Sequence, residues 1–403
     1  MDNHIVEKVL RDMDGIRIDS GAQTETETDS VGELDHDDTS NQGALFEIRL
    51  CPGKGLSLFA VTDIARGTWL IAENALIVVP SYAQDLKHLW KEFGKLTPQQ
   101  YVQMGDLSYV SGIINPSLQG YIRRRLSTRR QYGGPALDGA VKDEMQMRAI
   151  FSTNAVAMGM ESRYGRGLFL LSSRLNHSCV PNVFQDYNAT LGVTTVHATR
   201  AIKEGEELTL SYCQHVRNDR KERAEVLAFW KFKCDCPACK GPEVAERERR
   251  RQKIVELATG ESSKQHYRLA KYDLGLPTYG TPSNPSKALR WGEEVILLLK
   301  QQGLEDMELA PAYRKCSKYC VQLGQLEKAM AYARKELEVQ RYCLGTETAH
   351  MEKDMEGAEF WIKHLEQTAE KDRVKIAMNQ KRTKKEDKRA EKKAAKKAAK
   401  GGR

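Results

Sequence analysis

The chain has 403 residues, of which 40% are hydrophobic and 29% charged, so its length accommodates two or three domains with a sizeable core. Its net charge of +8 belongs to the last 23 residues, which carry 12 Lys/Arg against 3 Asp/Glu, and the rest of the chain is close to neutral. Apolar runs such as Ala75 to Pro80 fall far short of the ~20 residues that span a bilayer. With no apolar signal region at the start, we expect no membrane contact and a location in the cytoplasm, the nucleus or both.

The first segment, residues 1–43, is acidic. Residues 18–40 hold eight Asp or Glu and neither Lys nor Arg. Such a stretch cannot bury enough apolar surface to offset the entropy lost on ordering. We therefore expect a disordered leader, with an acidic interaction tail as the alternative.

Three short strands are expected next, at Leu45 to Leu50, Leu56 to Val61 and Thr68 to Val79. The first two enclose the turn Gly53-Lys54-Gly55-Leu56, where glycine would let a ligand approach the backbone closely. A simple strand-to-strand turn explains the pattern equally well. The turn is not a dinucleotide-binding fingerprint, because the third glycine is missing and a strand follows where a helix should.

The pattern from 81 to 148 is helical and polar, and strand character returns from Val183 to Tyr212. At the end of this second region, Leu208, Leu210 and Tyr212 alternate onto one face of a strand. If the leucines face the core, the tyrosine points inward too.

The segment Asn176-His177-Ser178-Cys179 lies between these two regions. One interpretation is a cysteine nucleophile with a histidine base, but adjacent residues of an extended chain point to opposite faces, so the pair is poorly placed for it. Apolar neighbours on both sides predict that the segment is buried. Its Asn and His side chains would then need partners, and a bound polar ligand is one way to supply them.

Three cysteines, Cys234, Cys236 and Cys239, crowd into six residues of a polar loop. Three thiolates this close can converge on one ion, and tetrahedral zinc needs a fourth ligand from elsewhere. The candidates for that ligand are Cys179, Cys213, Cys51 and His215. The alternative is a set of incidental buried cysteines.

After this loop the chain is predicted to be helical. Leu326, Ala329, Met330, Ala333 and Leu337 form one helical stripe, and Leu323-Gly324 just before them suits an inter-helix turn. The stripe resembles half of a tetratricopeptide repeat, but a single unit cannot stack. We expect an irregular antiparallel helical domain over 250–368, followed by a basic tail over 369–403.

Four motifs, taken in this order, resemble the SET domain, in particular the branch related to the SET-and-MYND lysine methyltransferases. The resemblance covers about 45 to 242. It rests on Gly53-Lys-Gly-Leu56, Asn176-His-Ser-Cys-Val-Pro-Asn182, Gly205-Glu-Glu-Leu-Thr-Leu-Ser-Tyr212 and Phe232-Lys-Cys-Asp-Cys-Pro-Ala-Cys239. It implies an α+β fold: a SET domain of short sheets with a pseudoknot over 44–217, a helical insert at about 81–148, a zinc-bound segment over 218–242, and the helical, TPR-like C-terminal domain.

The resemblance also implies site residues. Tyr212 would be the catalytic tyrosine, and Trp230 would line the lysine channel with it. One structural Zn²⁺ would be held by Cys179, Cys234, Cys236 and Cys239, which selects Cys179 as the fourth ligand. The methyl donor S-adenosylmethionine would be bound by Gly53, Lys54, Gly55, Leu56, Asn154, Asn176, His177, Tyr212 and Phe232.

Two departures from the family's pattern matter. No cysteine occurs between Cys51 and Cys179, so the MYND zinc module is absent. Ser57 also stands where many relatives carry glycine, which weakens the match of the cofactor turn. At Asn154 the alignment allows a slip of two residues, and a loop-capping Asn is the equal alternative.

We therefore expect a monomeric protein-lysine N-methyltransferase that acts on a histone or a non-histone protein. The alternative is a catalytically silent SET scaffold that binds partners through its helical domain and basic tail. That tail, residues 381–403, could contact phosphates weakly and without sequence preference, because it has no aromatic residue for base stacking. A nuclear-import signal or a solvated tail is the competing interpretation.

Overall fold

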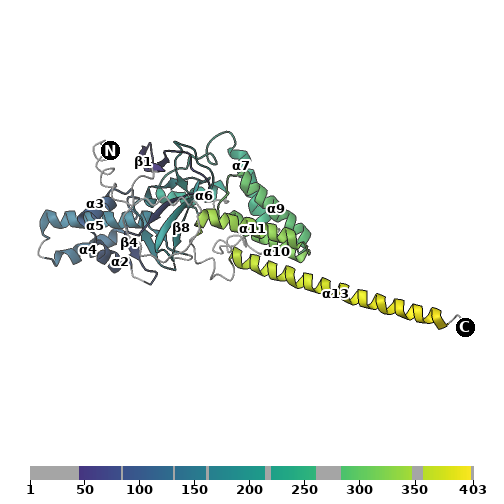
Figure 1. Ribbon diagram of the computed structural model, residues 1–403. Helices are drawn as coiled ribbons and strands as arrows, with labels where there is room; N and C mark the ends of the chain where they lie inside the picture. Colours follow the sequence, from purple (N-terminus) through teal and green to yellow (C-terminus); the bar gives the residue numbers. More distant parts are fainter. Residues whose placement is uncertain are drawn as a thin grey trace.

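The computed structural model describes residues 45–82, 85–129, 132–159, 163–213, 219–259, 283–346 and 357–400. The acidic segment predicted to be disordered lies outside these ranges. Strands and an outlying group of helices make up the first half of the chain, and the helices of the second half stack beside them (Figure 1).

Within the described ranges, ten short strands form four small sheets, with the strand orders β1-β2, β3-β9-β8, β4-β6-β5 and β10-β7. The strands are β1 (Phe46–Cys51), β2 (Gly55–Ala60), β3 (Trp69–Glu73), β4 (Ile77–Val79), β5 (Val156–Ala157), β6 (Arg166–Leu168), β7 (Asn176–His177), β8 (Val183–Asn188), β9 (Val193–Ala198) and β10 (Thr209–Leu210). The prediction of one strand from Thr68 to Val79 is therefore wrong. The chain leaves β9 after β3 and joins β6 with β4, and the continuous apolar pattern conceals this change of partner.

Strand β10 pairs in parallel with β7, so that Thr209 lies opposite Asn176 and Leu210 opposite His177. Immediately before β10, the same segment runs beside β2: the amide of Leu208 donates to the carbonyl of Leu58 (2.8 Å). The segment thus lies between the β1-β2 hairpin and β7. Leu58 and Leu208, both completely buried, anchor it in the core.

The prediction that the region from 81 to 148 is helical is confirmed for its described residues. They form α2 (Asp85–Phe93), α3 (Pro98–Gly105), α4 (Pro116–Ser127) and α5 (Gly134–Asn154). Two residues of α5, Ile150 and Phe151, pack with Ile77 and Leu168 of the β4-β6 pair in one buried cluster. The insert is therefore attached to the sheets through the end of α5 and through α2, whose Leu89 belongs to the same cluster.

The second half of the chain is helical, as predicted. Gly324, with φ +70°, turns the chain between α10 (Leu309–Gln322) and α11 (Leu326–Leu344). The resemblance to a tetratricopeptide repeat stays a prediction. None of the helices in the described ranges is both long and apolar enough to cross a bilayer. The elements are η2 (Ser172–Arg174), which precedes β7, and then α6 (Arg220–Leu227), η3 (Ala228–Trp230), α7 (Val244–Thr259), α9 (Pro285–Gln301), α10 (Leu309–Gln322), α11 (Leu326–Leu344) and α13 (Ala358–Lys400).

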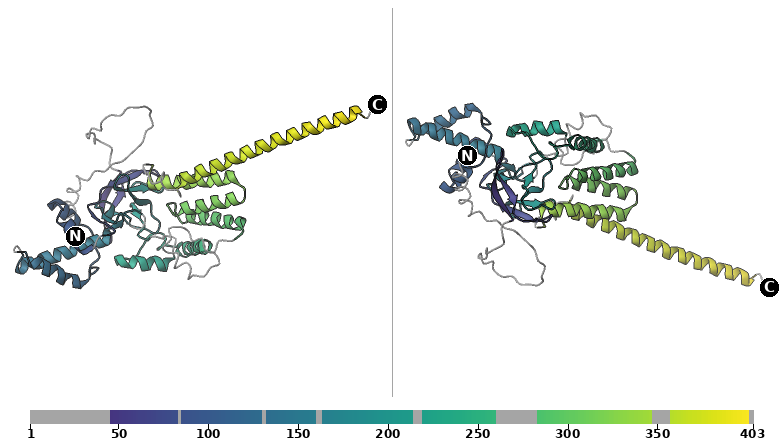
Figure 2. Two further views of the ribbon diagram at one scale, coloured as in Figure 1. Left: turned by 90° about the horizontal axis from the view of Figure 1, so that it is seen from below. Right: turned by 90° about the horizontal axis from the view of Figure 1, so that it is seen from above.

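Helix α13 runs without a break across the boundary that we predicted at 368. All views show it leaving the other helices and extending away from the body (Figures 1 and 2). The described side chains from 370 to 389 are all exposed. The predicted domain boundaries themselves stay predictions.

Helix α11 joins the helical half to the β3-β9-β8 sheet. Arg66, in the turn before β3, pairs with Glu338 of α11 (3.0 Å) and lies over the ring of Tyr342. At the end of α11, Gly345 lies directly against the buried ring of His197, and His197 stacks on Trp69 (5.8 Å between ring centroids).

Burial at this joint lowers the pKa of His197 to about 4, so the folded protein holds a neutral ring. In the unfolded chain the ring has its ordinary pKa of about 6.5 and takes up a proton as the pH falls below that value. Stability is therefore unaffected above pH 6.5 and decreases toward pH 4.

We predict that wild-type protein loses about 2 kcal/mol more unfolding free energy between pH 7 and pH 5 than His197→Gln does. Urea unfolding of both proteins at the two pH values measures this difference. The variant's lower stability at pH 7 does not affect the comparison, because only the change with pH is compared. Equal changes in the two proteins would contradict the assignment.

Candidate active site

The turn between β1 and β2 contains two glycines in the left-handed region, Gly53 (φ +77°) and Gly55 (φ +85°). A Cβ atom on Gly53 would meet no other atom within 4 Å, so this backbone borders open space. Between them, Lys54 directs its ammonium inward, toward Glu207 (3.3 Å) and Asp235 (3.6 Å). The turn is thereby tied to the segment before β10 and to the cysteine loop.

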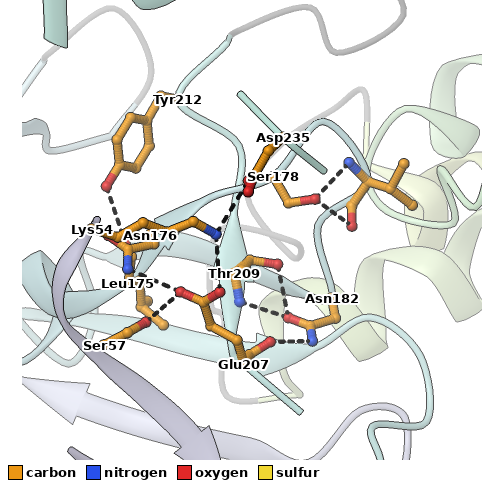
Figure 3. A network of polar contacts seen from close by, with 11 residues as sticks. Lys54, Ser57, Leu175, Asn176, Ser178, Asn182, Glu207, Thr209, Tyr212 and Asp235 are labelled. Carbon is orange, nitrogen blue, oxygen red and sulfur yellow. Dashed lines mark hydrogen bonds and ion pairs between the residues drawn. The ribbon is translucent and has the colours of Figure 1, made fainter. Parts of the chain in front are cut away.

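Glu207 is the centre of this polar network (Figure 3). One carboxylate oxygen accepts hydrogen bonds from the Ser57 hydroxyl (2.7 Å) and the Asn176 amide (2.9 Å), and the other oxygen faces Lys54. Glu207 is not among the site residues predicted from the sequence. Ser57, which weakens the match of the cofactor turn to the family, is completely buried and supplies one of the donors that Glu207 needs.

Tyr212 follows β10 and lies over His177, with the two ring centroids 5.4 Å apart. Its hydroxyl donates to the carbonyl of Leu175 (2.9 Å), and its backbone N–H donates to Nδ1 of His177 (3.0 Å). Burial and the charge of Glu207 raise the pKa of Tyr212. The phenol is therefore protonated at neutral pH.

His177 and Cys179 lie closer together than the sequence suggested. They are two residues apart and share a side of the chain, which brings Nε2 of His177 to 3.3 Å from the Cys179 sulfur. The expectation that they are poorly placed for contact is wrong, because it applied the rule for adjacent residues. The pair still does not resemble a nucleophile with its base, since Cys179 is completely buried among other thiols.

The same contacts define the charge of His177. Because Nδ1 accepts a hydrogen bond, the proton of the neutral ring is assigned to Nε2, which points at sulfur. Burial lowers the pKa of His177 to about 4, so the ring is neutral at physiological pH.

Trp230 and Phe232 complete an aromatic group around Tyr212. The Trp230 ring lies 4.8 Å from that of Tyr212, and the Phe232 ring lies 6.3 Å from it and 6.0 Å from His177. Lys231, the residue between them, has φ +58°, an uncommon backbone conformation for a residue other than glycine. Phe232 keeps 36% of its surface exposed, so its ring is available to a planar ligand.

Asn154, the last residue of α5, is engaged in local hydrogen bonds. Its amide donates to the carbonyls of Ser108 and Ile150, at 2.8 Å each. The loop-capping interpretation therefore describes its contacts. The Ser108 hydroxyl is also the atom that a Cβ on Gly55 would approach (3.3 Å). Asn154 therefore holds a residue that packs against the glycine turn.

Four cysteine thiols converge at the other end of the site: Cys179, Cys234, Cys236 and Cys239. Their sulfur atoms all lie within 4.8 Å of one another, and the sulfur of Cys179 is 3.6 Å from that of Cys239 and 3.9 Å from that of Cys234. Of the four candidates for the fourth position, Cys179 is the one that joins the group. Cys51 and Cys213 are not part of it, and His215 lies outside the described residues.

Hydrogen bonds among the four thiols lower the pKa of Cys236 and Cys239 and raise the pKa of Cys179 and Cys234. Metals bind the thiolate form, so a bound ion would displace the protons that the thiols share. Four thiolates around one zinc, each about 2.3 Å from it, would be about 3.8 Å apart. The observed sulfur separations fit this geometry, and they are far too long for disulfide bonds.

Comparisons with known proteins agree with this geometry. Residues 55–213 match the model of the SET domain. Over 295 residues the chain is 27% identical to the histone-lysine N-methyltransferase set5 of Schizosaccharomyces pombe, covering 72% of this chain and 76% of that protein. Over 81 residues it is 42% identical to the human protein-lysine N-trimethyltransferase SMYD5, covering 19% of each chain.

Among solved structures, the SET domain of LSMT bound to lysine and AdoHcy aligns with 82% of this chain and 88% of that one, at 12% identity and a TM-score of 0.30. The family match rests on the sequence comparisons, not on this alignment. They confirm the resemblance to SET-domain protein-lysine methyltransferases of the SET-and-MYND-related type.

The polar network leads to a stability prediction. In Glu207→Gln one carboxylate oxygen becomes an NH₂ group, which cannot accept from a donor, and Lys54 loses its partly buried counter-charge. We expect a loss of roughly 1–3 kcal/mol in unfolding free energy, because buried partners are left unsatisfied. Glu204→Gln, the same change at an exposed position of the preceding turn, should change stability by less than about 0.5 kcal/mol. Equal losses in the two variants, measured by urea unfolding, would show that Glu207 is not a structural centre.

Proposed function

We propose that this chain transfers a methyl group from S-adenosylmethionine to a lysine side chain of a protein. Its residues 55–213 match the model of the SET domain, a domain found in protein-lysine methyltransferases. The observation that carries the proposal is the protonated Tyr212, enclosed by His177, Trp230 and Phe232 beside an open glycine turn. A silent scaffold would have no use for this arrangement, so the alternative is not favoured.

The residues around the turn suit the donor's chemistry. The backbone of Gly53 to Leu56 allows close approach, and the ammonium of Lys54 suits a carboxylate. Phe232 offers a partly exposed aromatic face for the adenine and lies beside His177, and Asn176 is hydrogen-bonded to Glu207, the partner of Lys54. Asn154 would contribute through its contact with Ser108. When bound, S-adenosylmethionine supplies a methyl group activated by a sulfonium.

Tyr212 would orient the acceptor. Its hydroxyl proton is donated to the Leu175 carbonyl, which leaves the oxygen lone pairs free to accept a hydrogen bond from an amine N–H. That contact would point the amine's own lone pair at the methyl group. Alignment of this kind contributes several kcal/mol to a displacement that needs no covalent enzyme intermediate.

The acceptor lysine must be neutral to attack, although its ordinary pKa is about 10.4. A channel lined by Trp230 and Tyr212 would favour the neutral amine by removing it from water, and a nearby positive charge would act in the same direction. Since the Tyr212 phenol is protonated, it serves as an orienting group and not as the base.

The four-cysteine cluster would hold one zinc ion, in a structural role. Four thiolates leave no open position for a catalytic water. The ion would fix the loop that follows Trp230 and Phe232, and so keep both rings over Tyr212. As the substrate we propose a lysine-bearing protein, histone or non-histone, bound by a monomer.

Tyr212→Phe tests the catalytic proposal. We expect methyl transfer from labelled S-adenosylmethionine to cell extract or core histones to decrease by roughly 10²-fold, because one oriented hydrogen-bonding group is lost. Donor binding, measured by calorimetry, should change little. Tyr121→Phe, on the remote helix α4, is the control and should transfer at the wild-type rate. Wild-type protein that neither binds the donor nor transfers label would overturn the proposed function.

For the basic tail we propose a weak, salt-dependent contact with nucleic acid, with nuclear import as the competing role. Lys384, Lys388 and Lys392 are exposed and follow one line along α13 at intervals of four residues. Binding of duplex DNA should weaken as salt increases, and a plot of log association constant against log salt concentration has a negative slope. Replacing these three residues by Gln should make that slope shallower by up to about three. The triple variant Lys363→Gln, Lys371→Gln and Lys375→Gln, nearer the body, is the matched control. Unchanged DNA and RNA retention and unchanged nuclear distribution after deletion of 381–403 would rule out both roles.

A further inference from the structure

Two arginines are completely buried beside the four-cysteine cluster: Arg223 of α6, 1% exposed, and Arg251 of α7, 0% exposed. The guanidinium of Arg223 lies 4.0 Å from the Cys239 sulfur, and that of Arg251 donates to the backbone carbonyl of Cys179 (2.7 Å). Arginine is almost never fully buried unless its charge is compensated. The question is which anion performs this compensation.

Carboxylates account for part of it. Glu248 lies 3.6 Å from Arg223 and is partly exposed. Arg251 forms no ion pair with a carboxylate among the residues that the structure describes, although Glu248 and Asp306 lie near enough to interact with its charge. Burial raises the pKa of Asp306 to about 6, so this side chain is mostly ionised at pH 7. The cysteine cluster contacts both arginines, through the Cys239 sulfur and the Cys179 carbonyl.

A metal-loaded cluster would have the matching charge. Four thiolates around a divalent ion carry a net charge of −2, and the two guanidinium groups carry +2.

We propose that Arg223 and Arg251 balance the charge of a divalent metal tetrathiolate at Cys179, Cys234, Cys236 and Cys239, and that the ion thereby fastens the helical half of the protein to the SET domain. This inference rests on the zinc site of the proposed function. It goes beyond that site by assigning two positioning residues and a mechanical role.

The mechanical role follows from the place of α7. Two residues on it, Ile254 and Leu257, belong to the buried cluster that α9, α10 and α11 share. The loop after α9 also lies against the metal-binding segment, because a Cβ on Gly303 would come within 2.9 Å of the Val180 side chain. Arg251 therefore links the core of the helical half directly to Cys179.

The test compares zinc retention in full-length protein purified with zinc. The variants are Arg223→Met and Arg251→Met, which remove the charge at similar volume, and Arg251→Lys, which keeps it. Arg148→Met is the matched control, since Arg148 is equally buried but pairs with Glu144 in the helical insert. Zinc per chain is measured by mass spectrometry, and its release by transfer to a chromogenic chelator.

We expect one zinc per wild-type chain and release at least about 10-fold faster from both charge-removing variants, as for other groups that support metal ligands. Arg251→Lys should release zinc more slowly than Arg251→Met, and Arg148→Met at the wild-type rate. Chelation of wild-type protein should increase hydrogen exchange in α7, α9 and α10 and leave α2 to α5 unchanged.

Three results would overturn the proposal: wild-type release rates in both Met variants, equal losses in Arg251→Lys and Arg251→Met, or unchanged exchange in α7 after chelation. If the wild-type protein contains no zinc, the proposal fails as well, because it presupposes a metal ion at the four cysteines. None of these measurements uses substrate or methyl donor, so their failure is distinguishable from failure of the proposed methyl transfer. Circular dichroism confirms that each variant is folded before zinc is measured.

Discussion

The parallel pairing of β7 with β10 is the constraint on which the rest of the site depends. Two segments about 30 residues apart cross here, and the side chain of Asn182 fills the crossing. Its oxygen accepts from the Thr209 amide (2.7 Å) and its NH₂ group donates to the Glu207 carbonyl (2.9 Å). Because Asn182 is 1% exposed, both bonds replace water that cannot enter. The crossing brings together Glu207, the tyrosine after β10 and the cysteine after β7.

Buried polar groups hold the approach to this crossing as well. Glu73 of β3 accepts from the backbone amides of Leu171 and Ser172, just before β7, and from the Ser172 hydroxyl. A buried carboxylate would be costly without such donors. It therefore fixes how the chain enters β7, and with it the direction in which Asn176 and His177 point.

The segment that carries the aromatic residues contacts the helical region through backbone carbonyls. Trp230 donates to the carbonyl of Thr153 (3.2 Å) and Lys231 to that of Ser111 (2.6 Å). Backbone acceptors are present whatever side chains surround them, so these two contacts do not depend on the identity of Thr153 or Ser111.

The sequence by itself indicated the resemblance to SET-domain methyltransferases, the α+β character with a helical second half, and the four cysteines, since motif residues and hydrophobic periods are local properties of the chain. It did not determine which groups meet. Glu207 could not be distinguished from Glu206 as the inward carboxylate, and nothing local shows that Ser57 would supply its donor. The contact of His177 with Cys179 was misjudged, and the break at 74–76 was missed, because each depends on which distant strand the backbone follows. Arg223 and Arg251 look like any charged residues of polar helices. Only the tertiary structure buries them beside sulfur, where an uncompensated charge would be too costly to keep.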